Sequence, residues 1–432
     1  MVSVARVLLW EKPVGAVLWD DKRGAASFEF EPGFLKLELD IAPIKMPLAE
    51  MGKRGRIFTF PALATETYKG LPGLLADSLP DRFGNSLIDN WLAMQGRDPA
   101  SVNPVERLCY MGTRGMGALE FQPAQHPADR NKSNLLEISE LVSLAKEALA
   151  QRRTMKASLK KKRAANLAEI IKVGTSAGGA RAKAIIAYNE KNGAVQSGQV
   201  KAPKGFTHWL IKFDGVTNAK LGDPKGFGRI EYAYHKMAVA CGITMTQCRL
   251  LEENHRAHFM TQRFDRAGNA KLHMQTLCAL AHFDYNDPNA YSYEQAFQVM
   301  REMRLPYPDA KQLYTRMVFN VVARNQDDHT KNISFLMDNK GTWRLSPAYD
   351  ITNAHDPGNK WMSRHQMSVN GKRDKFTRAD LMAVAKEMNI KKPGEIIESV
   401  VSAVGDWPIY AKEAGVEKGQ VTAIGKQSRI KL

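Results

Sequence analysis

The chain has 432 residues, of which 44% are hydrophobic and 25% are charged. These values are typical of a globular protein with two or three domains, and they exclude a disordered or collagen-like chain. No apolar run approaches the roughly 18 residues that a membrane helix needs. Charged residues interrupt the apolar start, so we expect no signal peptide and no membrane contact. The four cysteines form no C-x-x-C pair, which indicates free thiols in a reducing cytoplasm.

The chain is strongly basic, because 62 Lys and Arg residues outnumber 45 Asp and Glu residues and leave a net charge of +17. Such a field attracts polyanions, which include nucleic acids, nucleotides and acidic proteins. The densest basic run spans residues 152–163. This run is either the solvated face of a helix or loop, or a contact surface for a phosphate backbone or an acidic partner.

The first 120 or so residues show β-like alternation of apolar and polar side chains, in VARVLLW, GAVLWDD, ASFEFE and FLKLELD. This pattern predicts a small meander sheet. A helix follows, with Asp81 or Asn85 as its N-cap, Gln95 near its end and Gly96 as its stop signal. Residues 122–134 are rich in Pro, Asp, Asn and Lys, and they predict a domain boundary.

Beyond the boundary the patterns become mixed and then helical. LLEISELVSLAKEALAQ has helical spacing, and residues 193–215 read as strands with turns. A helix is expected to end at Gly242, and a hairpin is expected around Gly268 and Asn269. From Tyr293 onward helical patterns dominate. The chain therefore runs from β-rich through mixed to α-rich.

The most informative stretch is ARNQDDHTKNISFLMD, in which Asp327 and Asn332 form a D-x-x-x-x-N pattern. Protein kinases use this spacing in the catalytic loop, where the Asp accepts a hydroxyl proton and the Asn holds Mg²⁺. An apolar segment leads into the loop and a strand-like segment leaves it. Asp350 follows in RLSPAYDI and supplies the further carboxylate that a Mg²⁺ site needs. On its own, Asp350 can equally be a helix cap.

Two elements upstream suit phosphate binding. The segment IKVGTSAGGARAK is rich in Gly, so its backbone N–H groups can approach phosphate oxygens, although it is neither a Walker A nor a G-x-G-x-x-G sequence. Lys212 ends an apolar strand pattern, as does the strand lysine of kinases, although it can also be an edge-strand lysine. The order of these parts is that of a kinase, and it predicts ATP-dependent phosphoryl transfer.

At these residues the chain resembles the HipA family, bacterial serine/threonine kinases that act as toxins of toxin–antitoxin pairs, and the resemblance covers nearly the whole chain. GTSAGGARAKA resembles the family's Gly-rich loop, QRFDR its hinge, NQDDHTKN its catalytic loop and SPAYDI its metal-binding motif. LPGLLADSLPDRFGN and MGALEF resemble its N-terminal domain. There are two departures. Ala182 precedes Lys183 where Pro is frequent, and Gln262 stands where a Glu can occur.

The resemblance implies a role for each motif residue. Asp327 would be the catalytic base, and Asn332 and Asp350 would bind Mg²⁺. The residues that would bind ATP are Ser176, Ala177, Gly178, Gly179, Ala180, Arg181, Lys183, Lys212, Gln262, Arg263, Phe264, His329 and Lys331. Ser176 is also where family members autophosphorylate, and a phosphate there would attract nearby basic side chains and pull the loop away from ATP. Alternatively, Ser176 is only a small residue that a tight loop tolerates.

The resemblance also implies the architecture. We expect an α+β protein with a bilobal, protein-kinase-like fold and a β-rich N-terminal accessory domain. The accessory domain would span residues 1–123, the kinase N-lobe with its Gly-rich loop 135–265, and an all-helical C-lobe with the catalytic loop 266–432.

The implied partners are a HipB-like helix-turn-helix antitoxin, operator DNA through the antitoxin complex, and a protein substrate. The family's substrates are aminoacyl-tRNA synthetases, glutamyl-tRNA synthetase in particular. Three alternatives stay open: a small-molecule or lipid kinase, a catalytically silent scaffold or corepressor associated with DNA, and a plain nucleic-acid-binding protein. Retention of Asp327, Asn332 and Asp350 speaks against the silent scaffold.

Overall fold

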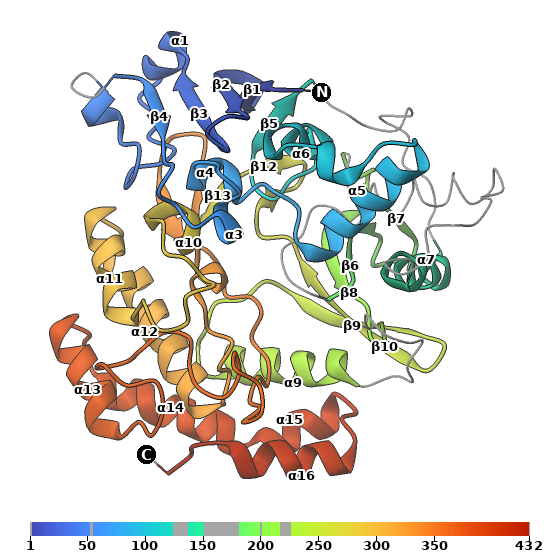
Figure 1. Cartoon of the computed structure of the whole chain (residues 1–432). Helices are drawn as coiled ribbons and strands as arrows, with labels where there is room; N and C mark the ends of the chain where they lie inside the picture. Colours follow the sequence, from blue (N-terminus) through green and yellow to red (C-terminus); the bar gives the residue numbers. More distant parts are fainter. Residues whose placement is uncertain are drawn as a thin grey trace.

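The computed structural model describes residues 2–51, 55–123, 137–150, 181–198, 201–216 and 226–431. The N-terminal strands lie at one end of the molecule, a second sheet lies at its side, and the C-terminal helices form the opposite end (Figure 1). Ser176, Ala177, Gly178, Gly179, Ala180 and the basic run 152–163 lie outside the described residues. Within the described ranges no helix combines the length and the apolar character needed to cross a membrane.

The N-terminal part is built on an antiparallel five-stranded sheet of order β4-β3-β2-β1-β5. Its strands are β1 (Val4–Leu9), β2 (Lys12–Asp20), β3 (Ala25–Phe30), β4 (Ile57–Thr59) and β5 (Leu119–Gln122). Alternate side chains such as Val7 and Phe28 are fully buried, as the meander pattern predicts. The strand expected over residues 34–40 is wrong. Pro32, at the first turn, starts the short helix α1 (Pro32–Leu35) instead.

The helices α3 (Thr65–Tyr68), α4 (Gly73–Ala76) and α6 (Pro104–Met111) pack into the core of this sheet, whereas α5 (Arg82–Met94) packs on α7 and the second sheet; 3₁₀ turns lie at Leu48–Glu50 and Pro99–Ser101. The predicted helix is α5. Its N-cap is Asp81, whose carboxylate accepts a hydrogen bond from the backbone N–H of Gly84, and its C-cap is Gln95. Between the two candidates, Asp81 is therefore the cap.

The second sheet has the order β7-β6-β8-β10-β9. It comprises β6 (Lys183–Tyr188), β7 (Val195–Ser197), β8 (Thr207–Lys212), β9 (Cys248–Glu253) and β10 (Arg256–Gln262), and it accompanies helices α7 (Ile138–Ala150) and α9 (Phe227–Ala240). Helix α9 packs closely on β10, because a Cβ at Gly228 would overlap the carbonyl oxygen of Ala257. This close approach positions the first turn of α9 beside the end of β8.

The C-terminal part is dominated by α10 (Leu277–Ala281), α11 (Tyr293–Glu302), α12 (Tyr307–Val322), α13 (Arg378–Glu387), α14 (Pro393–Gly405), α15 (Trp407–Glu413) and α16 (Lys418–Gln427). Helix α12 runs through the core and buries Tyr314 and Phe319 completely. The expectation of an all-helical C-lobe is wrong in one respect. A three-stranded sheet of β13 (His273–Thr276), β14 (Ser334–Met337) and β15 (Trp343–Leu345) lies among the helices. Its middle strand pairs on both sides, which satisfies the backbone groups of a buried segment.

The predicted hairpin around Gly268 and Asn269 is present as β11 (Arg266–Ala267) and β12 (Ala270–Lys271). The α+β fold class is confirmed, whereas the division of the chain into three domains at residues 123, 135 and 265 stays a prediction.

Candidate active site

Lys212, the last residue of β8, lies between two carboxylates that come from distant parts of the chain. Its Nζ is 2.5 Å from Oε1 of Glu231 in the first turns of α9, and it also contacts Asp350. Burial alone would lower the pKa of Lys212, but the two carboxylates outweigh burial and raise it. For Asp350 the effect of burial has the opposite sign and would raise the pKa. The ammonium groups of Lys212 and Lys183 outweigh burial and lower the pKa of Asp350 to about 2. Both groups are therefore charged at neutral pH.

The backbone at Asp350 has a φ of 53°, in the left-handed region, which is costly for a residue with a side chain even though Asn and Asp adopt it more readily than most. Its carbonyl oxygen accepts a hydrogen bond from Nδ2 of Asn325, at 3.4 Å. Asn325 begins the stretch predicted as the catalytic loop, so this bond ties that loop to the backbone of Asp350, whose carboxylate contacts Lys212. Because such a conformation is costly, its presence here indicates a constraint on where the carboxylate points.

The predicted catalytic loop connects α12 to β14. Within it, Nδ2 of Asn332 donates a hydrogen bond to the carbonyl oxygen of Asp327 at 2.7 Å. This bond closes the loop and leaves the amide oxygen of Asn332 as an acceptor. The Asp327 side chain stays 48% exposed, and Nε2 of His329 is 3.9 Å from its Oδ1. The protein packed around the loop and the neighbouring Asp350 raise the pKa of Asp327, and His329 opposes them.

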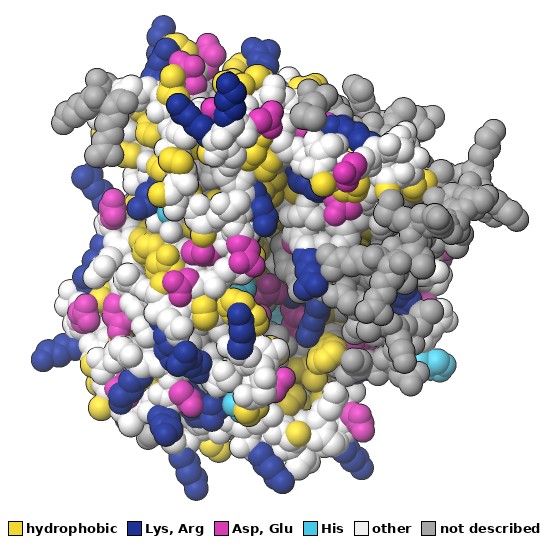
Figure 2. Space-filling model, viewed as in Figure 1, with side chains coloured by type: hydrophobic (Ala, Val, Ile, Leu, Met, Phe, Trp, Pro, Cys, Tyr) yellow, Lys and Arg dark blue, Asp and Glu magenta, His cyan; other side chains and the backbone are white. Residues whose placement is uncertain are grey.

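Two basic residues next to the Gly-rich segment fall within the described part of the chain. Arg181 is 3.8 Å from Glu231 and lies over the ring of Phe227 at 4.5 Å. Lys183, the first residue of β6, is 3% exposed and its Nζ is 3.3 Å from Oδ2 of Asp81. Burial lowers the pKa of Lys183, against the attraction of Asp81. Acidic and basic side chains lie near one another in the hollow at the centre of the face drawn in Figure 2.

The predicted hinge residues are the last residue of β10 and the two that follow it, and they differ in what surrounds them. Arg263 makes a buried bidentate ion pair with Asp265, at 2.9 and 2.7 Å, so its guanidinium is committed to a structural contact. Phe264 packs against Tyr349, next to Asp350, with ring centroids 5.4 Å apart. A backbone hydrogen bond positions Gln262, because its N–H donates to the carbonyl oxygen of Gln247.

Lys331 lies at the edge of the site that borders the N-terminal part of the chain. Its Nζ lies over the ring of Tyr285, 4.6 Å from the centroid. Burial would lower the pKa of Lys331, but Asp77 and other neighbours raise it. Asp77 itself accepts hydrogen bonds from the N–H and the hydroxyl of Thr276, at 2.7 and 2.9 Å.

Three carboxylates at this site, Glu231, Asp77 and Asp81, were not predicted as site residues from the sequence. Glu231 had a visible signal, because it lies in a predicted helix 19 positions after the strand lysine, where a kinase has the Glu that pairs with that lysine. Asp77 and Asp81 had no such signal. Asp81 was expected only as a helix cap, and nothing in its spacing relates it to Lys183, 102 positions later. Burial raises the pKa of Asp81 to about 6, with Lys183 opposing.

Comparison with known proteins finds two family models. The HipA N-terminal domain matches residues 5–122, and the HipA-like C-terminal domain matches residues 175–407. A curated relative, Putative kinase Y4mE of Sinorhizobium fredii, is 27% identical over 126 residues, which are 27% of this chain and 30% of the relative. The chain thus spans about a third of the length of that relative.

Among solved structures, HipA of Shewanella oneidensis, determined with HipB and operator DNA, has a TM-score of 0.68 at 15% identity and covers 98% of this chain and 95% of that one. The Helicobacter pylori kinase CtkA has a TM-score of 0.32 at 12% identity over 52% of this chain and 88% of that one, which is too low to support an argument. The Shewanella structure shares the fold across nearly the whole chain. The HipA-like C-terminal model alone matches more than half of the chain, and the HipA N-terminal model matches most of the part before it. The protein therefore belongs to the HipA family.

Proposed function

We propose that the protein is an ATP- and Mg²⁺-dependent serine/threonine kinase, acting as the toxin of a toxin–antitoxin pair. The observation that carries the proposal is the convergence of Lys212, Glu231 and Asp350 beside a loop that presents Asp327 and Asn332. A strand lysine paired with a helix glutamate, next to an Asp-to-Asn loop and a further Asp, is the set of parts that phosphoryl transfer needs.

The side chains fit a Mg²⁺ ion. Mg²⁺ prefers carboxylate and amide oxygens together with phosphate oxygens, and Asp350 is ionised while the amide oxygen of Asn332 is available. When bound, the ion would neutralise charge on the transferring phosphoryl group. Lys212, freed from Asp350, would contact the phosphates of ATP while Glu231 keeps it oriented.

Asp327 is assigned as the catalytic base. Its half-exposed carboxylate can accept the proton of an incoming serine hydroxyl, and its raised pKa brings it closer to the range in which a base is effective. His329 lies at its side and Asn332 holds its backbone. The contribution of the protein is therefore positioning and electrostatic stabilisation.

The remaining ATP contacts are assigned to Arg181, Lys183, His329, Lys331 and the backbone of the hinge over residues 262–264, together with residues 176–180 of the Gly-rich loop. Ser176 is assigned as an autophosphorylation site. Arg181 lies five residues after it and is 42% exposed, so a phosphate on Ser176 would have a basic partner within reach along the chain.

The proposed partners are a HipB-like antitoxin with operator DNA, and an aminoacyl-tRNA synthetase, glutamyl-tRNA synthetase in particular, as the substrate. The fold shared with the Shewanella protein, which was determined with HipB and operator DNA, supports the antitoxin. The net charge of +17 suits a protein held near DNA. We expect the protein to act in the cytoplasm.

A transfer assay tests the proposed activity. The full chain is incubated with Mg²⁺ and γ-labelled ATP, together with aminoacyl-tRNA synthetases, a serine-rich protein or small alcohols. Label on protein serine or threonine, lost in Asp327→Asn, supports the proposal. Label on small alcohols alone would favour a small-molecule kinase. Binding of DNA without nucleotide binding would favour a silent scaffold.

A further inference from the structure

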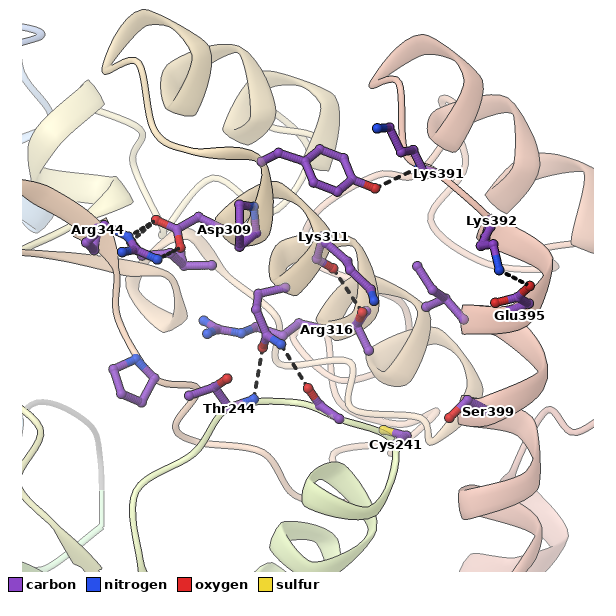
Figure 3. A pocket seen from close by; sticks show the side chains of 18 of the residues that line it. Cys241, Thr244, Asp309, Lys311, Arg316, Arg344, Lys391, Lys392, Glu395 and Ser399 are labelled. Atoms are coloured by element: carbon purple, nitrogen blue, oxygen red, sulfur yellow. Dashed lines mark hydrogen bonds and ion pairs between the residues drawn. The ribbon is translucent and has the colours of Figure 1, made fainter.

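A pocket of about 700 Å³, separate from the candidate active site, lies in the helical part of the molecule (Figure 3). Its walls come from the end of α9 and the loop after it, the first half of α12, the end of β15, and the start of α14. Ser346 and Pro347 line this pocket, whereas Asp350, three residues later, contacts Lys212. One short loop therefore separates the pocket from the candidate active site.

The lining of the pocket is positively charged. It contains five basic side chains, Lys311, Arg316, Arg344, Lys391 and Lys392, against two acidic ones, Asp309 and Glu395. Each acidic group already forms an ion pair with one of the basic side chains. Asp309 accepts two hydrogen bonds of 2.9 Å from Arg344, and Glu395 lies 2.9 Å from Lys392. Three positive charges are left in excess. They belong to Lys311 and Lys391, which are exposed, and to Arg316, which is buried.

Arg316 is the most informative residue of the lining. It is 6% exposed, and its Nη2 donates a hydrogen bond to the carbonyl oxygen of Ser346 at 2.6 Å. Its Nε and Nη1 have no hydrogen-bond partner within the described ranges. Burial lowers the pKa of Arg316 to about 10, so the group is still charged at neutral pH. A buried cation with two idle donors is costly unless something accepts from them.

Two helices also begin at the pocket. The N-caps of α12 and α14 are Pro306 and Lys392, and neither makes a side-chain capping bond in the described part of the chain. Helix N-termini carry partial positive charge and unpaired N–H groups, so both ends add to the attraction for an anion. Residues at both starts, among them Tyr307 and Ile396, line the pocket.

We propose that this pocket binds the phosphoryl group of a small phosphate ester, with Arg316 at its floor and Lys311 and Lys391 at its rim. The idle Nη1 of Arg316 can donate to one phosphoryl oxygen, and the excess of positive charge suits a dianion. The volume lies within the range of about 300–1,000 Å³ that is typical of small-molecule sites, so there is room for the organic part of an ester. Because the idle nitrogens are shielded from solvent, binding requires a small shift of the side chains around them.

Equilibrium dialysis of the full chain with labelled inorganic phosphate and labelled glycerol 3-phosphate tests the proposal. A non-hydrolysable ATP analogue and Mg²⁺ are present in excess, so that the candidate active site does not take up the probe. The wild type is expected to bind one glycerol 3-phosphate per chain, and more tightly than inorganic phosphate. Arg316→Met should weaken this binding by about tenfold or more, the loss expected for a charged hydrogen bond.

A double variant, Lys311→Ala/Lys391→Ala, should weaken binding similarly, and it guards against a folding defect of Arg316→Met because both lysines are exposed. Lys412→Ala/Lys418→Ala removes the same charge from exposed positions on α15 and α16 and should bind as the wild type does. Absence of binding by the wild type, or equal affinity in all these proteins, would overturn the site. Equal affinity for the two probes would overturn the assignment to an ester.

Discussion

Two lysines lie directly opposite each other on neighbouring strands, the buried Lys183 on β6 and the partly buried Lys212 on β8, yet their charges are balanced differently. Lys212 contacts Glu231 and Asp350, which raise its pKa. Lys183 pairs with Asp81 and its pKa is lowered by burial.

The first cluster is assembled within the region matched by the HipA-like C-terminal domain. The second crosses to the region matched by the HipA N-terminal domain, which contains Asp81. The charge that we propose contacts ATP is thus held by carboxylates of the same matched region, whereas the charge next to it depends on a carboxylate of the other matched region. The N-terminal part is in this way coupled to the wall of the candidate active site.

The largest expected effect comes from removing the charge at the first lysine. Lys212→Met should lower the rate of phosphoryl transfer by about 10²–10³-fold, because an electrostatic contact to the phosphates is lost and two carboxylates lose their cation. The rate with labelled ATP measures this. Lys236→Met on α9, which removes a partly exposed ion pair with Glu413 of α15, should leave the rate unchanged. Equal losses in both variants would contradict the assignment.

At the second lysine we expect an effect on stability that depends on pH. Lys183→Met leaves the buried Asp81 without its cation and should lower the free energy of unfolding by about 1–3 kcal/mol at pH 7.5. Denaturant unfolding measures the loss. The exposed Lys191→Met is the control, with a change within about 0.5 kcal/mol.

The sign of the pH dependence follows from the carboxyl group. The pKa of Asp81 is raised to about 6 in the folded protein, above its ordinary value of 3.8, so the folded state binds a proton more tightly than the unfolded state. The contribution of Asp81 therefore becomes less unfavourable as pH falls from 7 through 6. The destabilisation by Lys183→Met should shrink between pH 7.5 and 5.5. A loss that is constant over this range would refute the buried pair.

Asp350 should show the opposite pH dependence. Its pKa is lowered to about 2, so the stability that it contributes is present above pH 4 and is lost as pH falls from 4 to 2. In Asp350→Asn this acid-dependent part should be absent, so unfolding free energies of wild type and variant should converge below pH 3. If their difference does not change with pH, Asp350 is not held by Lys212.

The smallest effect is expected at Arg181. Arg181 is 42% exposed and lies 3.8 Å from the buried Glu231, and a long pair whose cation is in contact with solvent contributes about 0–1 kcal/mol. Arg181→Ala should therefore change the unfolding free energy by less than about 1 kcal/mol, since Lys212 still balances Glu231. A larger loss in denaturant unfolding would mean that Lys212 alone does not hold Glu231 in place.

Part of this arrangement could be predicted from the sequence, because some signals are local. The alternation in the first strands, the cap at Asp81 and the spacing from Asp327 to Asn332 all lie within short stretches. The strand expected over residues 34–40 failed because alternation competes with the Pro-initiated turn of α1. The all-helical C-lobe failed because β13 pairs with a strand about 60 residues away.

Contacts between distant segments left no such signal. Asp77 and Asp81 reach Thr276 and Lys183 only through folding, and their spacing in the chain carries no period. Arg316 reads as one more residue of a helix until its idle donors are seen beside the pocket. Periodicity and motifs therefore predict elements and single loops, whereas charge pairing across the molecule requires the structure.

The most direct test of the central assignment is the intact mass and the peptide map of the full chain after incubation with Mg²⁺ and ATP, beside Asp327→Asn. The starting material is first shown to carry no phosphate. The account predicts a phosphate on Ser176 in the wild type and none in the variant. Phosphate in both proteins would contradict the role of Asp327. Its absence from both, with no transfer to any added protein, would contradict the kinase itself.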